Sequence, residues 1–198
     1  MAEINAKMVS DLRARTGAGM MECKKALVEA NGNEEQAIEI LRKKGVATAA
    51  KKAGRTASQG LISAYIHSNN KVGVLIEVAC ESDFVAKNAD FQAFVKDLCM
   101  HIAATSPICI SRDQVPAELV AKEREIAEAQ LANDKKPENI KAKIIEGKLD
   151  KFYQGVCLLE QPFVKDDAHT VQEVLTQKIA TIGEKLEIKR FTRYQIGA

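Results

Sequence analysis

Hydrophobic residues in the first quarter of the chain recur at three- and four-residue steps, in short blocks separated by glycine-containing turns. This spacing predicts three amphipathic helices within residues 1–45. The first ends near residues 16–19, the second covers residues 20–30, and the third begins after Asn33, where Gln36 completes a pattern like a capping box. A unit this small buries a thin core, so it is better suited to docking than to catalysis.

After residue 59, the spacing of hydrophobic residues changes from that of helices to that of strands. Gly60–His67 and Val72–Cys80 are rich in β-branched residues and are joined by a turn that contains asparagine, which predicts an antiparallel hairpin. The second run is almost entirely apolar and predicts a strand buried on both faces. Leu186–Ile196 has the composition of a third strand. Between the second and third strands, helical spacing predicts helices at residues 83–105, 116–132, 137–146 (ended by Gly147) and 171–182.

These elements define the fold class and its parts. We expect an α+β protein with an N-terminal three-helix module, a basic linker, and a small antiparallel three-stranded sheet packed with helices. The corresponding boundaries are residues 1–45 for partner docking, 46–58 for the linker, and 59–198 for a core that serves dimerisation and partner binding. With 198 residues, of which 46% are hydrophobic, the chain can bury a substantial core.

Positive and negative charges nearly balance over the whole chain, but they are unevenly distributed along the sequence. Lys and Arg number 29 against 27 acidic residues, so the net charge of +2 gives no reason to expect nucleic acid or a membrane as the main partner. No acidic residue lies between Glu39 and Glu77, whereas basic residues cluster there. A nucleic-acid-binding arm has similar charge. However, no aromatic residue of this interval precedes Tyr65, and a solvated face is the commoner cause of such a run.

No cluster of residues indicates an enzyme or a cofactor. The three histidines are isolated and the five cysteines form no Cys-x-x-Cys pair, so we expect no metal, no cofactor and no disulfide framework. Gly17–Lys25 has the glycines and lysines of a phosphate-binding loop. It follows a helix rather than a strand and lacks the hydroxyl residue after the lysines, so we expect no direct nucleotide binding. The N-terminus has no apolar targeting core and no apolar run could span a membrane, which indicates a cytoplasmic location.

The segment Cys80–Asn88 joins the second strand to the helix that follows it. Ser82 or Asp83 can cap this helix, because a short oxygen-bearing side chain accepts hydrogen bonds from the free first-turn amides. Phe84 then lies in the first turn, where two interpretations are open. Its ring either folds back into the core, which is the more frequent arrangement for a lone phenylalanine, or projects beside a carboxylate as an interface anchor.

A second candidate contact surface lies on the second helix. Met20 and Met21 are consecutive, so they cannot both face the same small core. At least one is expected to be exposed, and exposed methionine makes an adaptable contact surface.

Four stretches of the sequence resemble the bacterial elongation factor Ts family. The first is Leu12–Leu27, with the sequence Leu-Arg-Ala-Arg-Thr-Gly-Ala-Gly-Met-Met-Glu-Cys-Lys-Lys-Ala-Leu, and the second is Asp83–Lys87, with the sequence Asp-Phe-Val-Ala-Lys. The similarity continues through Leu159–Val164 and Arg193–Gly197, so it covers essentially the whole chain. Two independent motifs at the expected separation make the resemblance specific. It implies that the first module has a ubiquitin-associated-like three-helix fold.

The resemblance implies a guanine nucleotide exchange factor for elongation factor Tu, the GTPase that carries aminoacyl-tRNA to the ribosome. Such a factor is not an enzyme, because distorting the phosphate and Mg²⁺ cradle of a GTPase weakens GDP binding without any covalent step. By this resemblance Phe84 inserts beside that cradle and Asp83 is its polar companion. The other partner-binding residues that it implies are Val85, Arg13, Met20, Met21, Lys24, Lys52 and His101. Read without the resemblance, Arg13 and Lys24 are ordinary solvated residues, and His101 is a core or boundary histidine.

The sequence departs from the family pattern in two respects. Ala79 and Ser82 stand where the family usually has Asn and Thr, although Ser keeps a capping hydroxyl. Longer members have two half-cores that carry the Asp-Phe motif and the histidine motif separately, whereas here both lie on one predicted helix. We therefore expect a homodimer paired through its sheets, in which one chain presents Phe84 and the other His101. The alternative from a different class is a non-catalytic adaptor that binds RNA through the basic linker and does not affect nucleotide exchange.

Overall fold

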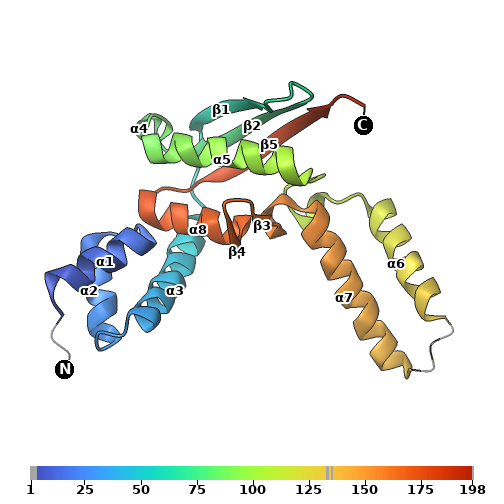
Figure 1. Ribbon diagram of the computed structural model, residues 1–198, viewed down its shortest axis with the longest axis horizontal. Coiled ribbons are helices and arrows are strands. Elements are labelled where there is room, and N and C mark those ends of the chain that lie inside the picture. The colour runs from blue at the N-terminus through green and yellow to red at the C-terminus, as the bar shows by residue number, and fades with distance from the viewer. Residues whose placement is uncertain (1–3, 133, 135, 198) are drawn as a thin grey trace. The chain divides into compact units, whose positions relative to one another are not determined.

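The structure, a computed structural model, describes residues 4–132, 134 and 136–197 (Figure 1). The helices are α1 (Ala6–Thr16), α2 (Met20–Glu29), α3 (Glu34–Lys52), α4 (Asp83–Ala86), α5 (Ala89–Thr105), α6 (Ala117–Leu131), α7 (Glu138–Val156) and α8 (Val171–Ile182). The strands are β1 (Gln59–Ile66), β2 (Val72–Cys80), β3 (Pro162–Phe163), β4 (Asp166–Thr170) and β5 (Glu187–Gln195), and β1, β2 and β5 form a three-stranded sheet in the order β1-β2-β5. This architecture confirms the predicted α+β class.

The N-terminal helices form where the sequence predicts them because each boundary has its own chemical cause. Asn5 and Asn33 accept hydrogen bonds from first-turn amides at the starts of α1 and α3, with distances of 2.9 and 3.0 Å. Gly17 ends α1 with a φ of +66°, in the left-handed region that glycine adopts without strain. The core between the three helices consists of Val9, Leu12, Cys23, Ala26, Leu27, Ala30 and Ala37.

The third helix is longer than the predicted module. α3 continues through Lys52, so the first half of the predicted linker is helical. Gly45 is buried in this helix, and a Cβ built on it lies 3.6 Å from the Cβ of Ala180 in α8. Contact with a second helix explains why the chain stays helical beyond residue 45. The boundaries at residues 45 and 58 remain predictions.

The hairpin is confirmed, and one of its strands is less buried than predicted. The turn between β1 and β2 closes through a hydrogen bond from His67 N to Val72 O of 2.9 Å, and Asn70 supplies a φ of +55°. Along β2, Val74 and Ile76 are buried, but the intervening Leu75 is 49% exposed. The prediction that β2 is buried on both faces was therefore wrong at Leu75, whereas Ala79, two residues of the same face further along, is buried at 6% exposure.

Two helix predictions need correction. The helix predicted over residues 83–105 is interrupted, because Asn88 accepts hydrogen bonds from Asp90 N (2.8 Å) and Phe91 N (3.2 Å) and thereby starts α5 afresh. The apolar face of α5 is buried as predicted. The helix predicted over residues 137–146 instead runs to Val156 as α7. Gly147 does not end it, and just before it the side chain of Glu146 pairs with Arg124 of α6 at 2.9 Å.

Contacts divide the described chain into two compact units. The first contains residues 4–62, 77–94 and 173–189, so it joins the N-terminal helices to α4 and α8. The second contains residues 63–76, 95–172 and 190–197, which include the hairpin of α6 and α7. Within the first unit, Arg42 pairs with Glu173 at 2.8 Å and Gln177 donates to Thr16 O at 2.9 Å. The N-terminal helices therefore pack on α8 rather than standing alone.

Candidate functional site

The turn after β2 presents an exposed aromatic ring. Ser82 caps α4, because its Oγ accepts a hydrogen bond from Val85 N at 3.3 Å, so the predicted cap is confirmed and Ser replaces Thr without loss of the hydroxyl. Phe84 is 81% exposed, which rejects the interpretation that its ring folds into the core. Asp83 lies beside it and pairs with Lys87 at 2.7 Å. A hydrogen bond from Lys87 holds the pKa of the Asp83 carboxyl below its ordinary value, so this carboxylate is charged at neutral pH.

Side chains from elsewhere in the chain hold this turn. The carboxylate of Glu184, in the loop after α8, accepts hydrogen bonds from Glu81 N (3.1 Å), Ser82 N (3.0 Å) and Ser82 Oγ (2.6 Å). The carboxylate of Glu81 in turn accepts a hydrogen bond of 2.6 Å from Lys185 N. We name residues 81–82 and 184–185, with these four hydrogen bonds, the carboxylate clasp. Val85, just beyond it, is half-buried.

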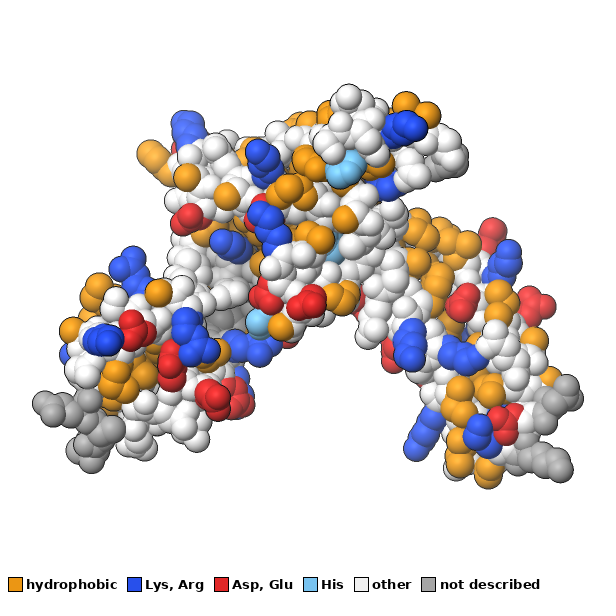
Figure 2. All heavy atoms as spheres, in the orientation of Figure 1, with side chains coloured by type: hydrophobic (Ala, Val, Ile, Leu, Met, Phe, Trp, Pro, Cys, Tyr) orange, Lys and Arg blue, Asp and Glu red, His pale blue; other side chains and the backbone are white. Residues whose placement is uncertain are grey.

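The candidate docking residues of the N-terminal helices lie on the surface. Arg13 and Lys24 are exposed, and Met20 and Met21 have exposed fractions of 59% and 63%. Both methionines, not only one as the argument from their spacing requires, are therefore available for contact. Figure 2 shows hydrophobic side chains exposed among charged ones over these helices.

The basic segment is extensively paired within the chain. Arg42 and Lys44 bind the carboxylates of Glu173 (2.8 Å) and Glu29 (2.7 Å), and Arg55 pairs with Glu81 at 3.3 Å. Lys52, a predicted partner contact, is half-buried, and its Nζ donates a hydrogen bond to Gly183 O. The charge of this segment thus has a structural role in its own unit.

His101 is fully buried, unlike the other candidate residues. Its Nδ1 accepts a hydrogen bond from Val164 N at 3.2 Å, which assigns the ring hydrogen to Nε2, and Nε2 donates to Gln161 Oε1 at 3.0 Å. The ring also packs on Phe163, with 5.7 Å between centroids. Because no surface of this side chain reaches solvent, the structure does not support the predicted direct contact of His101 with a partner.

Comparison with known proteins decides the family. A family model described as Elongation factor TS matches residues 6–198. The chain is 60% identical to elongation factor Ts of Acetivibrio thermocellus over 194 residues, which cover 98% of this chain and 90% of the relative. It is 58% identical to elongation factor Ts of Moorella thermoacetica, over 98% of this chain and 96% of the relative. The chain belongs to the elongation factor Ts family.

In this elongation factor Ts family member, the stretches that carry the resemblance have distinct structural roles. Leu12–Leu27 forms the methionine-bearing surface, and Asp83–Lys87 forms the exposed turn. Leu159–Val164 supplies Gln161 and Phe163, which surround the buried His101. This third stretch is therefore partly core, through Gln161 and Phe163, and partly surface, where Pro162 is exposed and Val164 is 49% exposed.

Sequence reasoning missed Glu184, the residue that binds the turn most extensively. It lies 102 positions from Ser82 along the chain, and nothing in its local sequence distinguishes it from other surface glutamates. Among the described residues there is also no group of His, Cys, Asp or Glu side chains that could hold a metal ion. None of the helices in the described part of the chain combines the length and apolar character that crossing a membrane requires.

Proposed function

We propose that this chain is a guanine nucleotide exchange factor that promotes GDP release from elongation factor Tu during translation elongation. Membership of the elongation factor Ts family supports this role. The observation that carries the mechanism is the 81% exposure of Phe84 on a turn that other side chains hold in place. An aromatic ring on a fixed turn can enter a pocket of a partner with little loss of conformational entropy.

The mechanism requires no covalent chemistry. A GTPase holds GDP through backbone amides, a lysine and Mg²⁺. We propose that Phe84 inserts beside this Mg²⁺ and phosphate region, with Asp83 as its charged neighbour and Val85 against the edge of the contact. Because binding free energies are linked, bound nucleotide lowers the affinity of the GTPase for the factor by the same ratio as the bound factor lowers its affinity for nucleotide. GTP can thus displace the factor and complete the cycle, and the factor itself binds no nucleotide.

The N-terminal helices would supply most of the docking surface. Met20 and Met21 offer two exposed thioether side chains that adapt to an apolar partner surface, and Arg13 and Lys24 add positive charge around them. Lys52 lies near the same unit's loop at Gly183, so we assign it a supporting role in addition to any contact with the partner. His101 is not included among the contacts because it is buried.

The test is the release of fluorescently labelled GDP from elongation factor Tu with the unmodified chain and with Phe84→Ala. Burying a phenylalanine side chain contributes about 1.5–3 kcal/mol, so removing the ring is expected to lower the accelerated rate by about 10-fold to 150-fold. Ile108→Ala is the control, since Ile108 is an apolar residue of the other unit that is also exposed, at 55%. If Phe84→Ala accelerated GDP release as much as the unmodified chain does, the ring would not be needed, and the docking helices would have to cause the release.

The RNA-binding adaptor is the alternative that this experiment must exclude. It predicts no acceleration of GDP release by any variant and RNA binding that weakens steeply with salt. The ion pairs of Arg42, Lys44 and Arg55 with carboxylates of the same chain favour the exchange factor, because they partly neutralise the charge that RNA binding needs.

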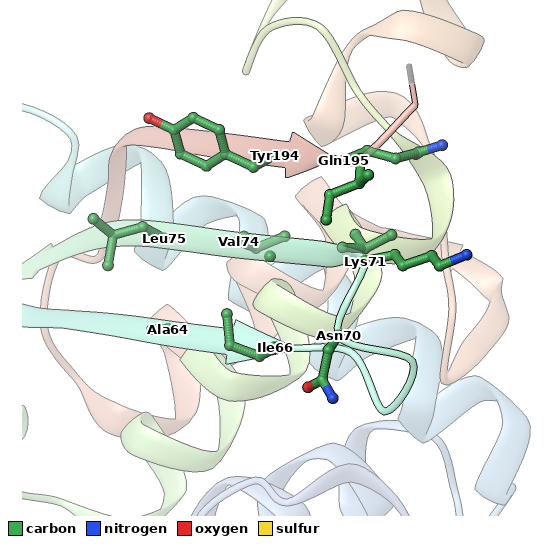
Figure 3. A pocket seen from close by; sticks show the side chains of 11 residues that line it. Ala64, Ile66, Asn70, Lys71, Val74, Leu75, Tyr194 and Gln195 are labelled. Carbon is green, nitrogen blue, oxygen red and sulfur yellow. The ribbon is translucent and has the colours of Figure 1, made fainter.

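We also propose that the chain forms a homodimer through the uncovered face of its sheet. Four apolar residues on this face are 49–73% exposed and line a hollow of about 470 Å³: Ile66, Leu75, Tyr194 and Ile196 (Figure 3). Among the described residues that line this hollow, Lys71 alone is charged. A second copy brings an equally apolar face, so pairing removes both from water. Sedimentation of the unmodified chain should give a dimer and Tyr194→Asp a monomer, and a monomeric unmodified chain with full exchange activity would refute the pairing.

A further inference from the structure

We infer that Glu184 is a positioning residue for nucleotide exchange: its carboxylate holds the Phe84 turn in the conformation that the partner meets. This inference rests on the proposed function and names a residue that the family resemblance did not supply. Glu184 lies in the loop between α8 and β5 and belongs to the same unit as the turn.

The turn depends on support from outside itself. α4 has only four residues, which is too short to be stable on its own hydrogen bonds. Phe84 is 81% exposed, so its ring has few contacts that could fix the turn through packing. The orientation of the ring is therefore set by whatever holds the residues just before it.

Glu184 supplies that support with both carboxylate oxygens. Oε2 accepts from the backbone N–H groups of Glu81 and Ser82 at 3.1 and 3.0 Å, and Oε1 accepts from Ser82 Oγ at 2.6 Å. Ser82 Oγ also accepts from Val85 N at 3.3 Å and so caps α4. Hydrogen bonds to a charged group are roughly twice as strong as neutral ones. One carboxylate thus fixes the backbone before the turn and the hydroxyl that caps it.

The hydrogen bonds of the clasp run in both directions between residues 81–82 and residues 184–185. Glu81 accepts from Lys185 N at 2.6 Å, and this hydrogen bond is the main cause that lowers the pKa of the Glu81 carboxyl. Lys185 Nζ donates to Arg55 O at 3.0 Å, and Arg55 pairs with Glu81 at 3.3 Å. The position of Glu184 relative to the turn is therefore fixed by bonds that do not involve Glu184 itself.

The same loop connects the turn to the docking helices. Lys52, the last residue of α3, donates to Gly183 O, next to Glu184. A chain of hydrogen bonds hence runs from α3 through residues 183–185 to Ser82. Through it, the surface that captures the partner and the ring that acts on the nucleotide site are held in one arrangement.

The experiment compares Glu184→Ala, Glu184→Gln and Ser82→Ala with the unmodified chain. The first readout is amide hydrogen exchange at residues 81 and 82, followed by NMR, which does not depend on elongation factor Tu. Glu184→Ala should increase exchange at both amides by about tenfold or more, because each loses its carboxylate acceptor. Glu184→Gln keeps one oxygen for these amides and an amide group that can donate to Ser82 Oγ, so it should remain close to the unmodified chain.

The second readout is the dependence of GDP release on factor concentration. Glu184→Ala should lower the maximal rate by about tenfold while leaving the half-saturating concentration nearly unchanged, because the docking helices are intact. Ser82→Ala keeps the two backbone bonds and should have an intermediate effect. Glu39→Ala is the control, since it removes one carboxylate from an exposed pair with Lys43.

A double variant separates positioning from general destabilisation. In the Phe84→Ala background, Glu184→Ala should have no further effect on the maximal rate, because there is no ring left to position. Unchanged amide exchange in Glu184→Ala, or an equal loss of rate with and without Phe84, would overturn the inference. If the unmodified chain fails to accelerate GDP release, the proposed function is overturned instead. The rates of amide hydrogen exchange at residues 81 and 82 then still show whether Glu184 holds the turn.

Discussion

The burial of His101 leads to a prediction about stability and pH. The ring is fully buried and Nδ1 accepts a backbone hydrogen bond, so the structure holds the neutral form. Burial lowers the pKa of His101 below its ordinary value, and the hydrogen bond with Gln161 partly opposes this shift. In the unfolded chain the pKa of a histidine is about 6.5, so below that pH the unfolded chain binds a proton that the folded chain does not.

The magnitude follows from the linkage between proton binding and folding. The contribution of neutral His101 to stability is complete above about pH 6.5 and is lost as the pH falls toward the lowered pKa of the folded chain. The slope is at most about 1.4 kcal/mol per pH unit for one proton. Between about pH 6.5 and pH 5, the free energy of unfolding should therefore fall by up to about 2 kcal/mol because of this residue.

The assay is urea unfolding followed by circular dichroism at about pH 7.5, 6 and 5, for the unmodified chain and for His101→Gln. The variant loses the Val164 hydrogen bond and the contact with Phe163, so it should be less stable at about pH 7.5 by about 1–3 kcal/mol. Its stability should depend less on pH, because the titrating group is gone. Identical pH dependence in both proteins would refute the argument that His101 is held neutral in the core.

Two further predictions concern backbone and thiols. Gly60→Ala should destabilise the chain by more than about 2 kcal/mol in the same urea assay, because a Cβ there lies 2.2 Å from Val78 O and the φ is +147°. Gly147→Ala is the matched control, with nothing within 4 Å of its Cβ, and should stabilise α7 by about 0.5–1 kcal/mol. All five cysteines are buried, and burial raises the pKa of Cys157 to about 12, so the folded chain should react with a chromogenic disulfide far more slowly than the urea-unfolded chain. A thiol of the folded chain that reacts as fast as in urea would contradict this.

Local chemistry explains what could be predicted from the sequence. Ser82, Asn33 and the Asn70 turn act within three or four residues of themselves, so their roles can be read from neighbouring positions. The buried face of α5 follows from the helical period alone. Leu75 was predicted to be buried because it is apolar, yet its exposure depends on whether another element covers that face of the sheet.

The remaining features depend on residues far apart in the sequence. The environment of His101 comes from Gln161 and Val164, about sixty positions away, so its burial could not be read from the helix on which it lies. Glu184 lies more than a hundred positions from the turn that it holds. Phe84 is an aromatic residue that statistics place in the core. Only the resemblance to a family, not its hydrophobicity, indicated that its ring projects.

The exposure of Phe84 has a consequence for the order of events when the two proteins meet. In the unbound chain the ring is already 81% exposed, and the clasp holds its turn before any partner arrives. The ring does not have to leave the core before it can enter a pocket, so the factor contributes no slow opening step to association. On the proposed function, the rearrangement that limits the rate then belongs to the GTPase, whose nucleotide site must open to admit a side chain that is already in place.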